Sequence, residues 1–188
     1  ADGLGAGGVA PVIKHIPGHG RATADSHKAL PTVDAPLSAL EATDFAPFQA
    51  LADLPIGMTA HIRYTALDAE RPLTTSATAV AGAVRQAIGF DGLLLTDDLC
   101  MHALGGGMDD RAARSLAAGC DIALHCDGTL DGGRAAAAGA QRLNAEGWRR
   151  WTAVRDWMAA RRDPAPFDER AAFVELTALT GAADGAAA

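Results

Sequence analysis

The chain has 188 residues, of which 49% are hydrophobic, 21% charged and 5% aromatic. This composition predicts one folded core of ordinary size and excludes disordered and collagen-like proteins. Asp and Glu number 23 against 16 Lys and Arg, which gives a formal net charge of −7. Because the basic residues are few and scattered, we expect no nucleic-acid partner.

The sequence contains no run close to the roughly 18 apolar residues of a membrane-spanning helix. Its first residues lack the basic-then-apolar order of a signal peptide. We therefore expect a soluble, cytoplasmic protein without a membrane partner. The cysteines Cys100, Cys120 and Cys126 are odd in number and lack metal-type spacing, so we expect reduced thiols that serve as small buried hydrophobes.

The chain opens with ADGLGAGG, without a methionine and without a helix start. The glycine-rich run over residues 4–8 is typical of the exit of a helix. Because that helix would lie upstream, we expect the chain to be the C-terminal part of a longer protein.

Short apolar runs alternate with helical patterns along the chain. The runs predict strands over residues 12–16, 57–62, 92–96 and 121–125. Ser38 with Glu41 forms a capping box for one helix, and Asp44 is the expected cap of a second, short helix. Periodic apolar residues predict two longer helices, over 75–88 and 109–118.

This order of elements predicts an α/β fold with a parallel sheet covered on both faces. Four βα units are half of a (β/α)₈ TIM barrel, which takes about 250 residues. We therefore expect the last four βα units of such a barrel. A doubly wound open sheet is the alternative, but no Gly-x-Gly-x-x-Gly follows a predicted strand; Gly105, Gly106 and Gly107 follow a short turn.

The composition shifts to Ala and Arg after Cys126. Residues 129–180 predict C-terminal helices, one over 133–143 and one that carries Trp148, Trp151, Val154 and Met158 and ends at the break over 161–164. Residues 181–188 predict an unstructured tail. The chain is thus expected to form one domain over 1–188, in which residues 1–128 carry the chemistry.

All six histidines lie in or just after predicted strands. In parallel α/β folds the carboxyl ends of the strands form the functional edge. A loop over residues 17–30 without hydrophobic pattern follows the first strand, and such long loops are usually functional. Within it, Asp25 can orient the imidazole of His27 as an acid/base group; an Asx-turn with a solvated histidine is the alternative.

The third predicted strand ends in Thr96-Asp97-Asp98. Successive strand residues point to opposite faces, so only one of the two carboxylates can face the mouth of a barrel. Its expected task is that of a nucleophile or metal ligand, because an unpaired buried charge is costly. A helix cap for the turn that follows is the alternative for either residue.

Four strand-end motifs together resemble the family 3 glycoside hydrolases, and more closely the bacterial β-N-acetylglucosaminidases of peptidoglycan recycling. The motifs are residues 14–20 (KHIPGHG), 25–27 (DSH), 58–61 (MTAH) and 96–101 (TDDLCM). The resemblance runs from about residue 8 to residue 127. It implies a retaining exo-β-N-acetylglucosaminidase that removes terminal β-linked N-acetylglucosamine from cell-wall muropeptides, with no cofactor and no metal.

The resemblance also implies roles for particular residues. Asp97 is the expected nucleophile, with Asp98 turned away, and His27 is the expected acid/base, paired with Asp25. Lys14 and His15 are expected to bind sugar hydroxyls. His19 and His61 are expected only to shape the loop and the barrel mouth. Phosphorolysis beside hydrolysis stays open, because an imidazole does not repel an anionic acceptor.

Two other interpretations compete with this one. The first is a metal-dependent hydrolase on the same barrel, with His15, His61, Asp97 and His125 as zinc ligands. The second is a catalytically silent fragment, since four βα units are only half of a barrel. The relatives' further sugar contacts, an Asp and an Arg, come from the other half.

Overall fold

A computed structural model describes residues 1–161 and 168–180. Its main sheet contains four parallel strands, all of which the sequence predicts, although their ends differ by up to three residues. They are β1 (Val12–Ile16), β3 (Ile56–Thr59), β5 (Leu93–Asp98) and β6 (Ile122–Leu124). The spatial order β1-β3-β5-β6 is the chain order, without the reversal that marks a doubly wound sheet. The sheet is thus part of a (β/α) barrel.

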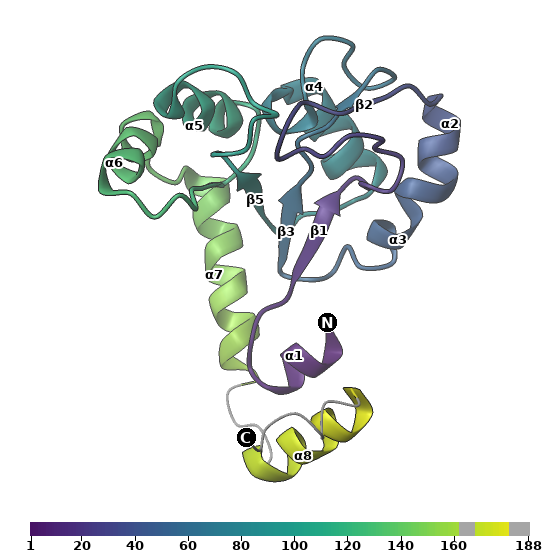
Figure 1. The fold of residues 1–188 in the computed structure, drawn as a ribbon, viewed down its shortest axis with the longest axis vertical. Coiled ribbons are helices and arrows are strands. Elements are labelled where there is room, and N and C mark those ends of the chain that lie inside the picture. Colours follow the sequence, from purple (N-terminus) through teal and green to yellow (C-terminus); the bar gives the residue numbers. More distant parts are fainter. Residues whose placement is uncertain (162–167, 181–188) are drawn as a thin grey trace, which may run out of the picture.

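Helices follow the strands as the alternation predicts. Figure 1 shows α2 (Leu37–Ala39) and α3 (Ala46–Gln49) beside β1, and α5 (Met108–Ala117) and α6 (Leu130–Gly139) at the opposite end of the sheet. Between β3 and β5 run the 3₁₀ helix η2 (Leu73–Thr75), α4 (Ala77–Ala79) and the π-helical η3 (Val80–Ala87). The helices α7 (Ala145–Ala159) and α8 (Glu169–Thr180) complete the described chain.

The hydrophobic core lies between the sheet and the helices that follow β1 and β3. Ile16 of β1, Leu40, Phe45, Val84 and Phe90 are all essentially inaccessible to solvent and belong to one cluster. These residues explain the expected helical period over 75–88, since its apolar face is the one buried against the strands. The strands therefore pack against these helices through their apolar side chains, while polar residues lie at the carboxyl ends of the strands.

Several predicted helix ends are wrong. The capping box is absent, because Pro36 is the N-cap of α2 and places Ser38 inside the helix, where it caps nothing. Asp44 does not cap α3 but accepts a hydrogen bond of 2.7 Å from Nε of Arg21. Thr129 caps α6 through Gly132 N–H, so this helix begins three residues before the predicted start.

Other differences concern the chain ends and a second small sheet. Residues 2–6 form a short helix, α1 (Asp2–Ala6), where no helix start was expected. The two-residue strands β2 (Thr32–Val33) and β4 (Arg63–Tyr64) pair in parallel, which no pattern of alternation predicts at this length. The tail over 181–188 and most of the break over 161–164 lie outside the described residues.

The cysteine prediction is only partly confirmed. All three thiols are free, and Cys120 is buried, where burial raises its pKa to about 12. Cys126 is exposed and Cys100 is half-buried, so neither is an ordinary core residue. Within the two described ranges, no helix has both the length and the apolar character needed to cross a membrane.

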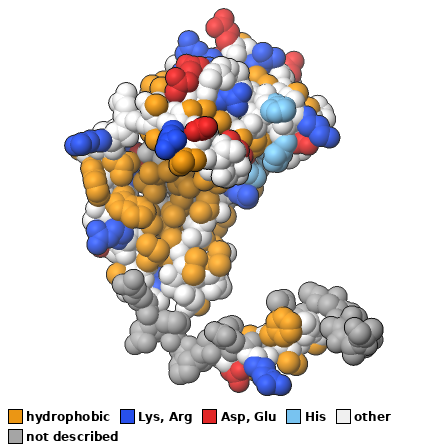
Figure 2. Space-filling view, turned by 60° about the vertical axis from the view of Figure 1, so that its left-hand side comes forward, with side chains coloured by type: hydrophobic (Ala, Val, Ile, Leu, Met, Phe, Trp, Pro, Cys, Tyr) orange, Lys and Arg blue, Asp and Glu red, His pale blue; other side chains and the backbone are white. Residues whose placement is uncertain are grey.

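The side formed by α5, α6 and α7 is turned forward in Figure 2, which shows hydrophobic side chains gathered below a charged rim. Exposed large hydrophobic residues of these helices include Leu130 and Trp148.

The helix α7 packs against β5, and hydrogen bonds between charged side chains hold it there. Asp91 accepts hydrogen bonds from Arg149 and Arg150 of this helix.

Asp121, at the amino end of β6, is the buried centre of this charge network. Its side chain is 5% exposed and pairs with Arg85 at 3.2 Å and with Arg150 at 3.0 Å, while Leu94 N–H donates to it at 2.9 Å. Asp121→Ala removes the acidic partner of the largely buried Arg85 and one of the two acidic partners of Arg150. We expect a loss of about 3 kcal/mol in the free energy of unfolding, measured in urea. The exposed Asp131→Ala is the control, with a change under about 0.5 kcal/mol.

Candidate active site

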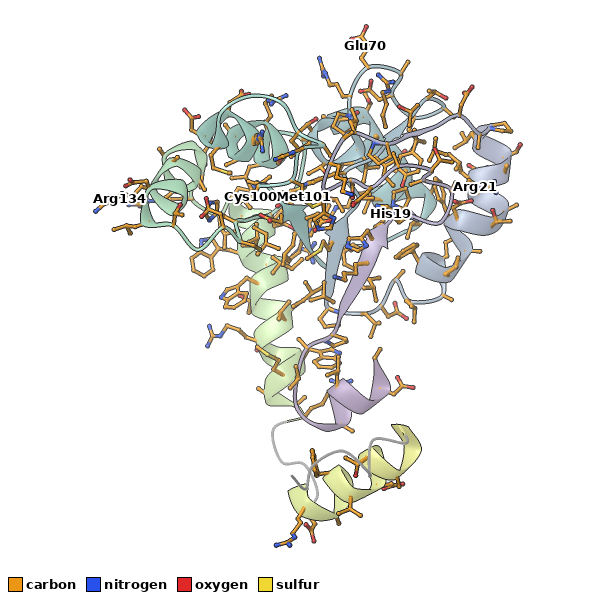
Figure 3. All side chains as sticks on the ribbon, in the orientation of Figure 1. His19, Arg21, Glu70, Cys100, Met101 and Arg134 are labelled. Atoms are coloured by element: carbon orange, nitrogen blue, oxygen red, sulfur yellow. The ribbon has the colours of Figure 1, made fainter. Side chains whose placement is uncertain are left out.

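Polar side chains from different strands meet at the carboxyl edge of the sheet. His15 in β1 and Asp97 in β5 are separated by β3, yet His15 Nε2 lies 3.4 Å from Asp97 Oδ2. Their side chains are 25% and 15% exposed, so both border the opening. In Figure 3, His19 lies beyond the end of β1, and Cys100 and Met101 lie beyond β5 on the same side. His15 and Asp97 thus meet at one common edge of the sheet.

The His15 imidazole is uncharged at neutral pH. Burial lowers its pKa, the negative charge of Asp97 opposes this effect, and the charges of Lys14, His19 and His27 lower it further. These five residues therefore act on one another electrostatically at the same edge. Because the lowered pKa favours the neutral imidazole, the 3.4 Å contact of His15 with Asp97 is weaker than a full ion pair.

The loop between β1 and β2 presents the predicted Asp25 and His27 pair. Asp25 Oδ1 accepts hydrogen bonds from both the backbone N–H of His27, at 2.9 Å, and its ring Nδ1, at 3.0 Å. The Asx-turn and the carboxylate–imidazole pair are thus the same structure. These hydrogen bonds lower the pKa of Asp25. Because an ionised carboxylate only accepts, the proton is on Nδ1 and Nε2 is free to exchange one.

His27 itself points into solvent, with 76% of its side chain exposed. Its backbone carbonyl accepts a hydrogen bond of 3.3 Å from His102 N–H, in the segment after β5. Ser26 contacts His19 Nε2 through its hydroxyl at 3.3 Å. The loop is thereby connected to the ends of both β1 and β5 while the imidazole stays uncovered.

The two carboxylates at the end of β5 have different partners, as the alternation along a strand predicts. Asp97 faces His15, whereas Asp98 Oδ1 accepts the backbone N–H groups of Cys100, at 2.9 Å, and Cys126, at 3.1 Å. Asp98 thus joins the segments that follow β5 and β6. The bond from Cys100 N–H is of the capping type that the sequence offered as the alternative for this residue, whereas the bond from Cys126 N–H was not predicted.

His61 is fully buried just after β3. Its Nε2 donates to the carbonyl of Asp98 at 3.1 Å, and its Nδ1 lies 2.8 Å from Thr74 Oγ1. Burial lowers its pKa, which favours the neutral ring, and the Thr74 hydroxyl also donates to the carbonyl of Ala60 at 3.1 Å. Through the hydrogen bond to Asp98, His61 connects the segment after β3 to the end of β5.

This buried histidine predicts a dependence of stability on pH. An unfolded histidine has a pKa near 6.5, and the folded pKa values of His15 and His61 are lower. The unfolded chain therefore binds more protons below about pH 6.5, and the free energy of unfolding should fall from pH 7 to pH 5. His61→Leu should cost about 2 kcal/mol at pH 7 and flatten this slope. Urea unfolding at several pH values tests both; equal slopes would contradict the assignment.

The structure does not bring together the four ligands of the metal-hydrolase alternative. Both ring nitrogens of His61 already have protein partners, so it is not a ligand. His125 Nε2 lies 3.1 Å from Asp127 Oδ1, in a different group of side chains. The set of His15, His61, Asp97 and His125 is therefore wrong as a metal site.

The fold and this edge define part of a (β/α) barrel with a carboxylate and histidines at the strand ends. Residues 1–142 match the family model described as the glycosyl hydrolase family 3 N terminal domain. The chain belongs to this family, as its strand-end motifs predict.

Individual relatives agree with this assignment. A β-hexosaminidase of Chromobacterium violaceum is 41% identical over 129 residues, which are 66% of this chain and 36% of the relative. A solved family 3 β-N-acetylglucosaminidase from Paenibacillus sp. has a TM-score of 0.74 and 29% identity, over 86% of this chain and 34% of that one. NagZ from Neisseria gonorrhoeae, solved with N-trifluoroacetyl-D-glucosamine, has a TM-score of 0.65 and 32% identity, over 79% and 44%.

Proposed function

We propose that this protein is a retaining exo-β-N-acetylglucosaminidase that removes terminal β-linked N-acetylglucosamine from cell-wall muropeptides in the cytoplasm. The observation that carries the proposal is the contact between His15 and the Asp97 carboxylate beside the loop of Asp25 and His27. The chain spans 36% of the length of the Chromobacterium relative, so the activity is proposed for the protein that contains this edge.

In the proposed reaction Asp97 attacks the anomeric carbon and forms a glycosyl ester. His27 Nε2 carries the proton that goes to the leaving oxygen, while Asp25 holds the ring through Nδ1. In the second step Nε2 takes a proton from water, and the hydroxide oxygen replaces Asp97 at the same carbon. Two displacements at one centre give net retention of configuration.

The sugar is assigned from the site and from the relatives. His15 contacts Asp97, and Lys14 and His15 are proposed to bind the hydroxyls of the sugar. The Neisseria neighbour was solved with an N-acylated glucosamine, which supports an acetamido sugar as the substrate. The three free thiols agree with a reducing compartment such as the cytoplasm. Muropeptides are proposed as the source of the sugar on the family resemblance.

The test is hydrolysis of 4-nitrophenyl N-acetyl-β-D-glucosaminide, followed by proton NMR of the first sugar released. We expect the β-anomer first and little turnover of the matching β-glucoside. An α-anomer as first product would overturn retention, and equal turnover of both sugars would overturn the acetamido preference. No turnover would favour the silent-fragment alternative. Sugar 1-phosphate formed in phosphate buffer would add phosphorolysis.

A further inference from the structure

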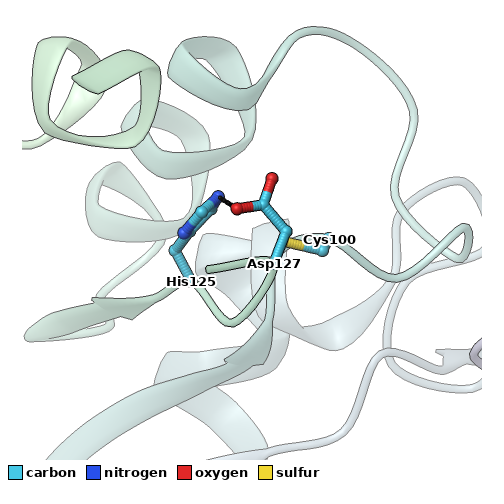
Figure 4. Close-up of side chains that lie close together, drawn as sticks. All are labelled: Cys100, His125 and Asp127. Atoms are coloured by element: carbon cyan, nitrogen blue, oxygen red, sulfur yellow. Dashed lines mark ion pairs between the residues drawn. The ribbon is translucent and has the colours of Figure 1, made fainter. Parts of the chain in front are cut away.

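A sulfur, a nitrogen and an oxygen ligand converge beyond the ends of β5 and β6, in side chains that the proposed reaction does not use. Figure 4 shows Cys100, His125 and Asp127 in this cluster. The Cys100 thiol, one His125 ring nitrogen and one Asp127 carboxylate oxygen all lie within 4.8 Å of one another. We propose that these three residues bind a zinc ion.

The ring nitrogen of His125 supports a ligand at this place. Nε2 is buried and has no hydrogen-bond partner within the described chain, and the whole side chain is 12% exposed. The Asp127 oxygen lies 3.1 Å away, within the distance of an ion pair. A buried polar nitrogen without a partner is costly, and a cation between the two groups would satisfy both.

The Asp127 carboxylate is held in place by its neighbours. It accepts hydrogen bonds from the backbone N–H and hydroxyl of Thr129, at 2.7 and 2.9 Å. A metal ion bound beside it would ionise the Cys100 thiol and release one proton.

Asp98 holds the backbone of the cluster in place. This carboxylate accepts the N–H groups of Cys100 and of Cys126, the residue between His125 and Asp127. Both segments that carry ligands are thereby fixed relative to each other, although they follow different strands. Such prior fixing lowers the entropy that binding an ion would cost.

The ligand types select the metal. Thiolate, imidazole and carboxylate together match the preferences of zinc, with bond lengths of about 2.3, 2.0 and 2.1 Å. Calcium and magnesium prefer oxygen ligands alone. Three protein ligands leave a fourth position for water, so a modest inward movement of the side chains would complete a tetrahedral site.

Cobalt(II) is the probe, because a cobalt–thiolate bond gives a charge-transfer band in the near ultraviolet. We expect the protein to bind one Co²⁺ with this band, to release a proton on binding, and to exchange Co²⁺ for Zn²⁺. Cys100→Ser should remove the band, and His125→Gln or Asp127→Asn should weaken binding at least tenfold. Cys126→Ser, an exposed thiol next to His125, is the matched control and should bind as the wild type does.

A backbone variant tests the geometry without removing a ligand. Gly132 lies in the first turn of α6, and a Cβ there would collide with His125 Nε2 and Asp127 Oδ2. Gly132→Ala should therefore weaken Co²⁺ binding at least tenfold while circular dichroism stays unchanged. The proposal is overturned if Cys100→Ser keeps the band, or if wild type shows none. It is also overturned if Asp97→Asn, and not Cys100→Ser, abolishes binding, because the ion would then lie beside His15.

Discussion

Replacement of Asp97 by alanine should abolish turnover of every β-N-acetylglucosaminide, whatever the leaving group. Without this carboxylate no glycosyl ester forms, and the loss of a covalent nucleophile typically costs on the order of 10⁴-fold or more in kcat. The measurement is release of 4-nitrophenol and of a plain alkyl alcohol from matched substrates. Both rates should fall to background, since both bonds depend on the same attack.

Two further measurements make this prediction specific. Added azide should restore turnover of the nitrophenyl substrate in Asp97→Ala and give the α-glycosyl azide, because the anion attacks from the vacated side. Asp53→Ala, an exposed carboxylate just before β3, should act as wild type. If Asp97→Ala keeps more than a tenth of wild-type activity, Asp97 is not the nucleophile.

His27→Ala should separate good leaving groups from poor ones. An alkyl alcohol must be protonated as it departs, whereas 4-nitrophenolate leaves unaided, so only the first needs the general acid. We expect kcat/KM for the alkyl glycoside to fall by about 10²–10⁴-fold, and the nitrophenyl substrate to lose much less. Equal losses on both substrates would contradict the acid/base role.

The partner of this histidine should have an intermediate effect. Asp25→Asn keeps the imidazole but replaces the carboxylate that accepts from Nδ1 at 3.0 Å, so its activity on the alkyl glycoside should lie between wild type and His27→Ala. Lys28→Ala changes the next residue of the same loop and is the control, with activity near that of wild type. Asp25→Asn as damaging as His27→Ala would give Asp25 a larger part than orientation.

The strands and their order could be predicted because each is a short apolar run between turn residues. Leu93, Leu94 and Leu95 form such a run, and the paired strand ends follow from the parallel arrangement. Helix ends were predicted less well, because several neighbouring residues can each serve as the N-cap. Ser38 matches a cap by residue type, but Pro36 fixes an earlier start. The pair β2 and β4 depends on tertiary packing, which two-residue strands do not reveal in sequence.

The candidate site divides in the same way. Asp25 and His27 are two residues apart, so their pairing could be inferred locally, and the strand-end position of Asp97 follows from the run before it. The contact of His15 with Asp97 spans the intervening strand β3, so it depends on the order and curvature of the sheet. The cluster of Cys100, His125 and Asp127 joins two separate segments, and no spacing in the sequence marks it.

Asp97 and His27, the two groups proposed to react, are held in the fold to different degrees. Asp97 is part of a strand whose neighbours on both sides hold it by backbone pairing, whereas the loop that carries His27 is held by single hydrogen bonds, among them those of His102 and Arg21. Exchange of residues 17–30 for a loop of another relative should therefore leave Asp97 in place, because the pairing of β5 does not involve this loop. The leaving-group specificity of the proposed enzyme can then be changed through this loop without a change to β5.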